Sequence, residues 1–263
     1  MGCRDRSIDY LKAYGYNVVR LPKADLRPLE LLSRGDGALD RFGQLTTVLA
    51  GDGSAPLPLI SDDVEAPHIS GQRSSELKIG LGLSILGNII AAMGGSKLGI
   101  SVAYQHAAAV TFEFSNVREN RVEVAALDRY LASADIDPLS RQAARFLEDE
   151  AMYVVTSTIK SEKLTVHAQT SEGGSLDLDV PVIQEAVGGT ISVSAAGKRA
   201  STLTYEGPVP LVFGFQAVQL FYEDGVYRAI ASAEDVTARA LTDAPKDGAV
   251  RYVAAAPMLR VND

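Results

Sequence analysis

The amino-acid sequence predicts an α+β fold in which helices surround a twisted, mainly antiparallel central sheet. Several segments alternate apolar and polar residues with the period of two expected for strands, and residues 127–150 carry apolar residues at helical spacing. Glu223-Asp-Gly225 separates two apolar segments and predicts a hairpin turn. The chain of 263 residues, 46% of them hydrophobic, can bury a sizeable core in one large domain or two small ones.

The N-terminal region predicts short elements separated by turns. Residues 5–14 carry apolar side chains at helical spacing and predict a short helix. Residues 16–21 predict a strand that ends at Pro22, and residues 26–32 predict a second short apolar element. Prolines, glycines and acidic residues are frequent in 51–68, which predicts a long surface loop.

Residues 77–114 form the first of two long, weakly charged stretches. No charged residue occurs from Ile79 to Ser96, a length near the lower limit of a transmembrane helix, but glycines and polar residues interrupt the run. Small and aliphatic residues alternate in 80–85 and predict a strand. Residues 86–93 predict a short apolar helix, and 100–114 predict a long strand.

Residues 152–194 form the second stretch. Residues 152–159 and 164–168 alternate as strands do, on either side of a charged break at 160–163. Residues 181–187 predict a short helix, and beyond this stretch 211–222 predict an apolar strand that leads into the hairpin turn.

The charge of the chain argues against nucleic acid as a partner. The sequence has 25 Lys and Arg against 33 Asp and Glu, a formal net charge of −8, whereas nucleic-acid-binding proteins normally present a basic face to phosphates. Residues 1–34 differ, with seven basic and four acidic side chains. Their net charge of +3 is compatible with an anionic membrane surface.

Motifs of hydrolases, metal sites and nucleotide-binding loops are missing from the sequence. It has no G-x-S-x-G, H-E-x-x-H or C-x-x-C pattern, and its one cysteine excludes an intrachain disulfide. The glycines of 80–87 match neither the dinucleotide fingerprint nor a P-loop. The first fifteen residues lack the apolar core of a secretory signal. We therefore expect a cytoplasmic protein that is not an enzyme and uses no metal or other cofactor.

The two long stretches have two interpretations. They can form a twisted sheet with one face in solvent, or they can be latent transmembrane β-hairpins. A barrel strand needs only about 9–11 residues, apolar outward and polar inward, and this pattern is weak in each segment. Patterning alone does not separate the two interpretations.

Eight blocks, in order over roughly residues 1–230, are similar to those of one known family. They are Met1-Gly-Cys3, Asp9–Pro22 (DYLKAYGYNVVRLP), Arg27–Leu32 (RPLELL), Ile69–Gln72 (ISGQ), Phe112–Val117 (FEFSNV), Gly174–Pro181 (GSLDLDVP), Val187–Gly189 (VGG) and Leu211–Phe215 (LVFGF). In these blocks the chain resembles the bacterial gasdermins.

The resemblance implies a pore-forming cell-death effector, monomeric and inactive while a short C-terminal segment is present. A protease, often caspase-like, removes that segment in this family. The released N-terminal portion then inserts β-hairpins into the lipids of the cell's own inner membrane and assembles a ring. The biological setting implied is abortive defence against phage. In a bilayer every backbone N–H and C=O must be paired, so β-hairpins from many chains have to close into a barrel.

Cys3 is the residue that matches the S-palmitoylated N-terminal cysteine of the family. The N-myristoylation pattern fits poorly, because position six is Arg6 instead of Ser or Thr. An acyl chain is a marginal membrane anchor by itself, and the basic N-terminal segment can supply the second signal. The alternative is an incidental terminal thiol.

Residue pattern and resemblance together divide the chain into three segments. Residues 1–241 are the expected pore-forming domain, 242–249 a protease-sensitive linker with turn-forming residues, and 250–263 an autoinhibitory peptide. The candidates for the residue before the cut are Leu241, Asp243 and Lys246. The expected autoinhibitory contacts are the apolar residues Tyr252, Val253, Met258, Leu259 and Val261. The alternative for the last segment is an ordinary packed C-terminus.

The expected membrane-facing side chains share parity within the predicted strands of the two stretches. They are Val102, Tyr104, Leu164, Val166 and Ala168. Two other classes of function remain open at this stage. One is a lipid-anchored, non-enzymatic binding module whose sheet never leaves its folded form. The other is an enzyme with a dispersed site, for which the sequence offers no residue.

Overall fold

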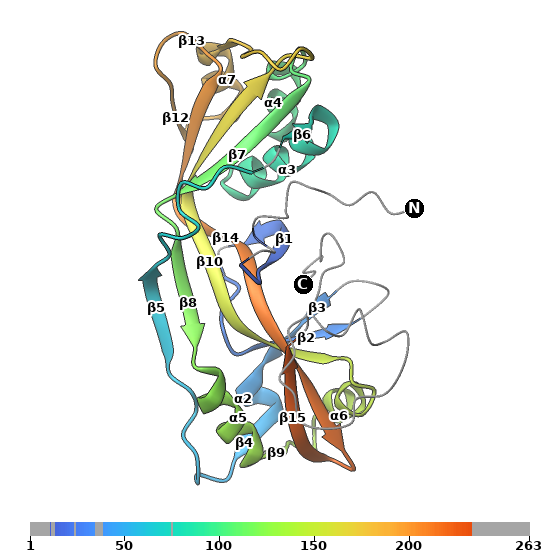
Figure 1. Cartoon of the computed structure of the whole chain (residues 1–263). Helices are drawn as coiled ribbons and strands as arrows, with labels where there is room; N and C mark the ends of the chain where they lie inside the picture. Colours follow the sequence, from blue (N-terminus) through green and yellow to red (C-terminus); the bar gives the residue numbers. More distant parts are fainter. Residues whose placement is uncertain (1–10, 12–13, 24, 35–38, 75, 233–263) are drawn as a thin grey trace.

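Two long antiparallel strands, β10 (Met152–Gln169) and β14 (Thr202–Glu223), run along the length of the molecule and form its axis (Figure 1). This structure, a computed structural model, describes residues 11, 14–23, 25–34, 39–74 and 76–232. The central strand order is β1-β14-β10-β2-β3, and every pairing recorded in this sheet is antiparallel. These outer strands are β1 (Asn17–Lys23), β2 (Glu30–Arg34) and β3 (Leu39–Gln44). The predicted α+β class with a mainly antiparallel sheet is confirmed.

One end of the sheet carries a separate layer of helices, and we call this end the head (Figure 1). The head contains β10 from Lys163 to Gln169 and β14 from Thr202 to Glu206, together with the elements between Leu77 and Ser115 and between Leu178 and Ala200. These elements are β6 (Leu77–Lys78), α3 (Ile79–Ala92), α4 (Lys97–Ala103), β7 (Ala109–Ser115), β11 (Leu178–Asp179), α7 (Val180–Val187), β12 (Ser192–Ser194) and β13 (Arg199–Ala200).

The opposite end, which we call the base, packs short strands and helices around a second apolar core. A middle region, with β5 beside β8, connects the base to the head. The elements of base and middle are α2 (Leu45–Val48), β4 (Leu49–Gly51), β5 (Ile60–Glu65), β8 (Arg118–Val122), α5 (Val124–Ala132), β9 (Ala134–Ile136), α6 (Arg141–Glu148) and β15 (Val226–Ser232).

The head begins at a wide bulge in β14. Lys163 pairs with Glu206 and Ser161 pairs with Leu211, so residues 207–210 of β14 stand opposite a single residue of β10. Two of these four residues are prolines, which have no N–H to donate to the ladder and are confined to edges and bulges within sheets. The two strands nevertheless continue across this point. The predicted break of the strand at the charged residues 160–163 is therefore wrong. β10 stays paired there, and the extra residues of β14 only shift the register of the pairing.

Several smaller expectations change as well. Strand β1 runs through Pro22 instead of ending there, with a register shift between Val18 and Lys23. The surface loop predicted over 51–68 contains β5, which pairs with β8 at one edge of the sheet. The hairpin turn between β14 and β15 is confirmed, with positive φ angles of 53° at Asp224 and 75° at Gly225.

A buried ion pair joins β2 to β3. Glu30 is 1% exposed, and the guanidinium of Arg41 lies between the carboxylates of Glu30 and Asp25. The amide Nε2 of Gln44 donates to Oε1 of Glu30 at 3.3 Å. Burial raises the pKa of Glu30, and Arg41 opposes this rise through its hydrogen bond and its charge. Arg41 therefore keeps a charged carboxylate stable inside the fold.

Arg41→Met is expected to lower the free energy of unfolding by about 3 kcal/mol, because Glu30 loses its cation. Without Arg41 the pKa of Glu30 rises further above its ordinary value of 4.5, so the folded state binds the proton more tightly than the unfolded state. The stability of the variant should therefore fall as pH rises from 4.5 towards neutrality. Urea unfolding at acidic and neutral pH measures this difference. Arg118→Met, which breaks an exposed pair with Glu65, is the control, with an expected change within about 0.5 kcal/mol. A loss of equal size at both pH values would contradict the assignment.

Candidate functional site

Three neighbouring strands of the head are amphipathic in the same direction. Val166 of β10 lies opposite Phe112 of β7 on one side and Leu203 of β14 on the other. These three side chains and their neighbours of equal parity form one buried apolar layer. Its strand members are Val110, Phe112, Leu164, Val166, Ala168, Leu203 and Tyr205, each 4% exposed or less.

Helices α3, α4 and α7 cover this apolar layer. Leu86 and Ile90 of α3, Ile100 of α4 and Ile183 of α7 are fully buried in the same cluster as the strand residues. Figure 1 shows α3 and α4 beside β7 at this end of the molecule. The helices pack against the sheet through their apolar sides, and these apolar contacts are non-directional and stabilised by the exclusion of water.

The other side of the same strands is polar. Thr165 Oγ1 and Thr204 Oγ1 are 3.0 Å apart across the β10–β14 pair. Nδ1 of His167 lies 2.9 Å from Oγ1 of Thr202, and Nε2 of His167 lies 3.8 Å from Oε2 of Glu113 on β7. Burial lowers the pKa of His167, with a further contribution from Arg73, so the imidazole is neutral at pH 7. One face of the head sheet is therefore apolar and the other is hydrogen-bonded and polar.

The structure places most of the expected membrane-facing residues in one core. Leu164, Val166 and Ala168 share one buried face, as their alternation predicts. Tyr104 joins the same cluster from the end of α4, whereas Val102 is 64% exposed on the outer side of that helix. The structure thus brings four of the five expected membrane-facing residues together and leaves Val102 apart.

The strand predicted over 80–85 is wrong in the folded chain, where α3 occupies these residues. The strand predicted over 100–114 is wrong in its first part, because α4 and a following turn precede β7, which begins at Ala109. Apolar residues of α3 also repeat with the helical period, and Leu86, Ile89 and Ile90 face the sheet. Gly82 permits close packing, because a Cβ at this position would lie 2.3 Å from Cγ2 of Val110. A short apolar run with glycines fits both the strand period and the helical period, and packing against β7 favours the helix.

A buried carboxylate in the middle of the sheet was not predicted. Oε1 of Glu119 on β8 accepts hydrogen bonds from Tyr16 and Ser157, both at 2.7 Å, and Arg121 lies 3.4 Å from Oε2. Burial raises the pKa of Tyr16, so its hydroxyl remains a donor. These residues are far apart in sequence, and no local pattern indicates their meeting. Through these hydrogen bonds, Tyr16, which directly precedes β1, is held against β8 and β10.

The other predicted site residues lie outside the described residues of the chain. These are Cys3, the cleavage candidates Leu241, Asp243 and Lys246, and the autoinhibitory residues Tyr252, Val253, Met258, Leu259 and Val261. The linker 242–249 and the peptide 250–263 also fall there.

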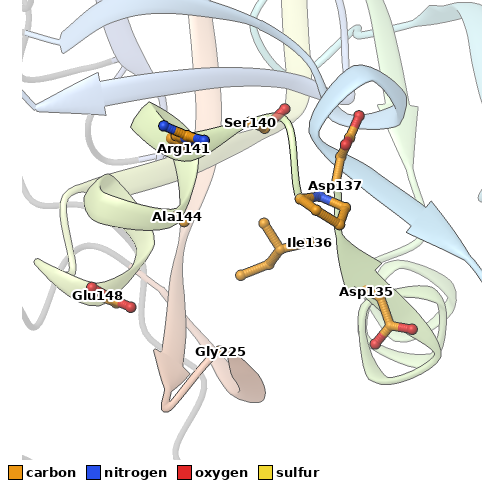
Figure 2. Close-up of a pocket in the computed structure, with 9 residues that line it drawn as sticks. Asp135, Ile136, Asp137, Ser140, Arg141, Ala144, Glu148 and Gly225 are labelled. Atoms are coloured by element: carbon orange, nitrogen blue, oxygen red, sulfur yellow. The ribbon is translucent and has the colours of Figure 1, made fainter.

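An open hollow of about 550 Å³ lies between β9, α6 and the β14–β15 turn. Figure 2 shows Ile136 near its middle, with Arg141 and Glu148 on the α6 side and Asp135 on the other. These charged groups do not converge on one point, so the hollow suggests no reaction. Within the described residues, His, Cys, Asp and Glu nowhere gather in threes as a metal site requires, and none of the helices there is both long and apolar enough to cross a bilayer.

Comparison with known proteins places this architecture in a family. The model of the Bacterial Gasdermin Family matches residues 19–226. The chain is 48% identical over 263 residues to a gasdermin bGSDM of a Desulfuromonadales bacterium, covering 99% of both chains. It is 47% identical over 252 residues to that of Lysobacter enzymogenes, covering 94% of this chain and 93% of the relative. The solved structure of a bacterial gasdermin from Bradyrhizobium tropiciagri has the same fold, with a TM-score of 0.59 at 17% identity over 86% of this chain and 91% of that one. The chain therefore belongs to the bacterial gasdermins, a family of pore-forming effectors.

Proposed function

We propose that this protein forms membrane pores by turning the apolar face of its head sheet towards lipid. The observation that carries the proposal is the sidedness of β7, β10 and β14 in the head. One face is apolar and covered by helices, and the other is polar. If α3, α4 and α7 move away from the sheet, the apolar face can contact lipid hydrocarbon and the polar face can line an aqueous lumen. Transmembrane barrel strands have this arrangement.

The lengths of the strands fit a membrane span. β10 has 18 residues and β14 has 22, whereas a tilted membrane strand needs about 9–11. The head contains only Lys163–Gln169 of β10 and Thr202–Glu206 of β14, so a membrane span also includes residues beyond the bulge at 207–210. A single hairpin would leave backbone groups unpaired at its edges, at a cost of several kcal/mol each in hydrocarbon. Stable insertion therefore requires many copies of the chain in a closed ring, which makes oligomerisation an integral step of the mechanism.

The hairpin proposed for residues 77–114 requires a change of secondary structure. Residues 79–103 are largely helical in the folded chain and contain Lys97 as their single charged side chain. This composition gives the segment few charges to transfer into a membrane. We infer that α3 and α4 become extended and continue the ladder of β7 during insertion.

The proposed regulation uses both ends of the chain. Proteolysis within 242–249, by a caspase-like enzyme, removes the inhibitory peptide 250–263 and releases the pore-forming domain of residues 1–241. Palmitoylation of Cys3 brings this domain to the inner membrane, where pores end the growth of a phage-infected cell. The relative from the Desulfuromonadales bacterium aligns with 99% of this chain, so the two proteins are similar in length. The uncleaved protein is proposed to be a cytoplasmic monomer.

Dye release from liposomes of phosphatidylglycerol and phosphatidylethanolamine tests the proposal. A site for a specific protease is inserted within 242–249, and the full-length protein is assayed before and after cutting. We expect release only after the cut, together with ring-shaped oligomers in negative-stain images. Binding to the liposomes without release, before and after the cut, would instead support a lipid-anchored binding module.

A further inference from the structure

Two tyrosine hydroxyls meet inside the apolar core of the head. Tyr104 is the residue at the C-terminal end of α4, and Tyr205 lies on β14. Both side chains are 0% exposed, and their hydroxyl oxygens are 2.7 Å apart. Burial raises the pKa of both phenols, so both hydroxyls keep their protons. This hydrogen bond joins a helix to a strand 101 residues away in sequence.

The apolar contacts around this bond are of a different kind. Gly99 of α4 packs against Ala186 of α7 so closely that a Cβ on Gly99 would lie 2.5 Å from Cβ of Ala186. Ile100 is buried against the same cluster. Such contacts tolerate small displacements, whereas a hydrogen bond weakens steeply when its distance or angle changes. The tyrosine pair therefore fixes where α4 ends on the sheet.

We propose that the Tyr104–Tyr205 hydrogen bond is a latch that holds α4 in its helical, docked form and sets how readily residues 97–108 become extended. The proposal rests on the proposed function, in which this segment enters a membrane hairpin. Seven helical residues span about 10 Å, whereas seven extended residues span about 23 Å. Extending α4 displaces Tyr104 along the strand direction and breaks the bond. The break leaves a buried hydroxyl on β14 without its partner, which opposes the first step of opening.

Tyr→Phe variants test the latch because they keep the rings and remove only the hydroxyl oxygens. Each single variant, Tyr104→Phe or Tyr205→Phe, leaves the other hydroxyl buried and unpaired. We expect each to speed dye release by the cut protein about tenfold. The double variant removes the same bond as each single variant, so its release rate should stay within about threefold of the single variants and not show the product of their two effects. Tyr130→Phe is the matched control, because Tyr130 is a buried tyrosine of the base whose hydroxyl donates a hydrogen bond to the carbonyl of Leu49, and it should leave the release rate unchanged.

Hydrogen exchange of the uncut protein gives a readout that does not require a pore. Amides of residues 97–108 should exchange faster in each single variant and to a similar extent in the double variant, while those of 218–223 in the base stay unchanged. Unchanged exchange at 97–108 in both single variants would overturn the latch, as would a double variant whose effects simply add. Absence of dye release from the cut wild-type protein would overturn the proposed function instead, and the exchange pattern would still decide whether this bond holds α4.

Discussion

Val166→Asp is expected to lower the free energy of unfolding by about 4–5 kcal/mol or more. Val166 is 0% exposed, between Phe112 and Leu203 and in the same core as helices α3, α4 and α7. A carboxyl group at this position enters an apolar layer, where an unpaired polar or charged group is severely destabilising. The polar groups of the head, such as His167, lie on the opposite face of the strand.

The stability of this variant should also depend on pH. The apolar surroundings raise the pKa of the new carboxyl in the folded state, so folding favours the protonated form. Stability is therefore highest below the pKa of the unfolded state and falls as pH rises. Urea unfolding near pH 4 and pH 8 measures the difference. His167→Gln is the control, because it keeps a polar neutral side chain beside Thr202 and should change stability by less than about 1 kcal/mol. Equal stability of the two variants would contradict the position of Val166 in this core.

Alternation predicts which residues share a face but not what covers that face. The equal parity of Leu164, Val166 and Ala168 is correct, because side chains of a strand alternate wherever the strand lies. Helices α3, α4 and α7 cover these residues, and for much of α3 and α4 the local pattern favours strands. A glycine-rich apolar segment is compatible with both periods, so the choice depends on tertiary packing. The close approach of Gly82 to Val110 is such a packing contact, and one sequence does not reveal it.

Polar contacts between residues far apart in the chain could not be predicted from the sequence, for a related reason. The tyrosine pair and the Glu119 cluster each join residues that are far apart in the chain. Their geometry follows from strand register, and register is set by bulges such as the one at 207–210. The two prolines there are visible in the sequence, but the number of residues in the bulge is fixed only when both strands are paired. The function itself was indicated by the family resemblance, since residue patterning leaves both a solvated sheet and a latent hairpin open.

Because Val166 belongs to the folded core, a charge at this position tests folding and insertion together. Val102 separates the two. It is 64% exposed on α4, and the adjacent Ser101 is exposed as well, so the folded chain accepts Asp at either position. Both positions lie near the C-terminal end of the same short helix, where a negative charge costs a similar few tenths of a kcal/mol to about 1 kcal/mol. The two variants are therefore matched in the folded state.

Val102→Asp is expected to abolish dye release by the cut protein, whereas Ser101→Asp should leave release within about threefold of the wild type. In an extended strand these neighbours point to opposite faces, and Val102 is the one proposed to meet lipid. A charged side chain on the lipid face near the bilayer midplane costs about 2–4 kcal/mol, and every subunit of a ring bears that cost. Urea unfolding should give both uncut variants equal stability within about 0.5 kcal/mol, which confirms that the comparison concerns insertion. Normal release by Val102→Asp would remove this segment from the membrane wall, and loss of release in both variants would show that neither face of it meets the lumen.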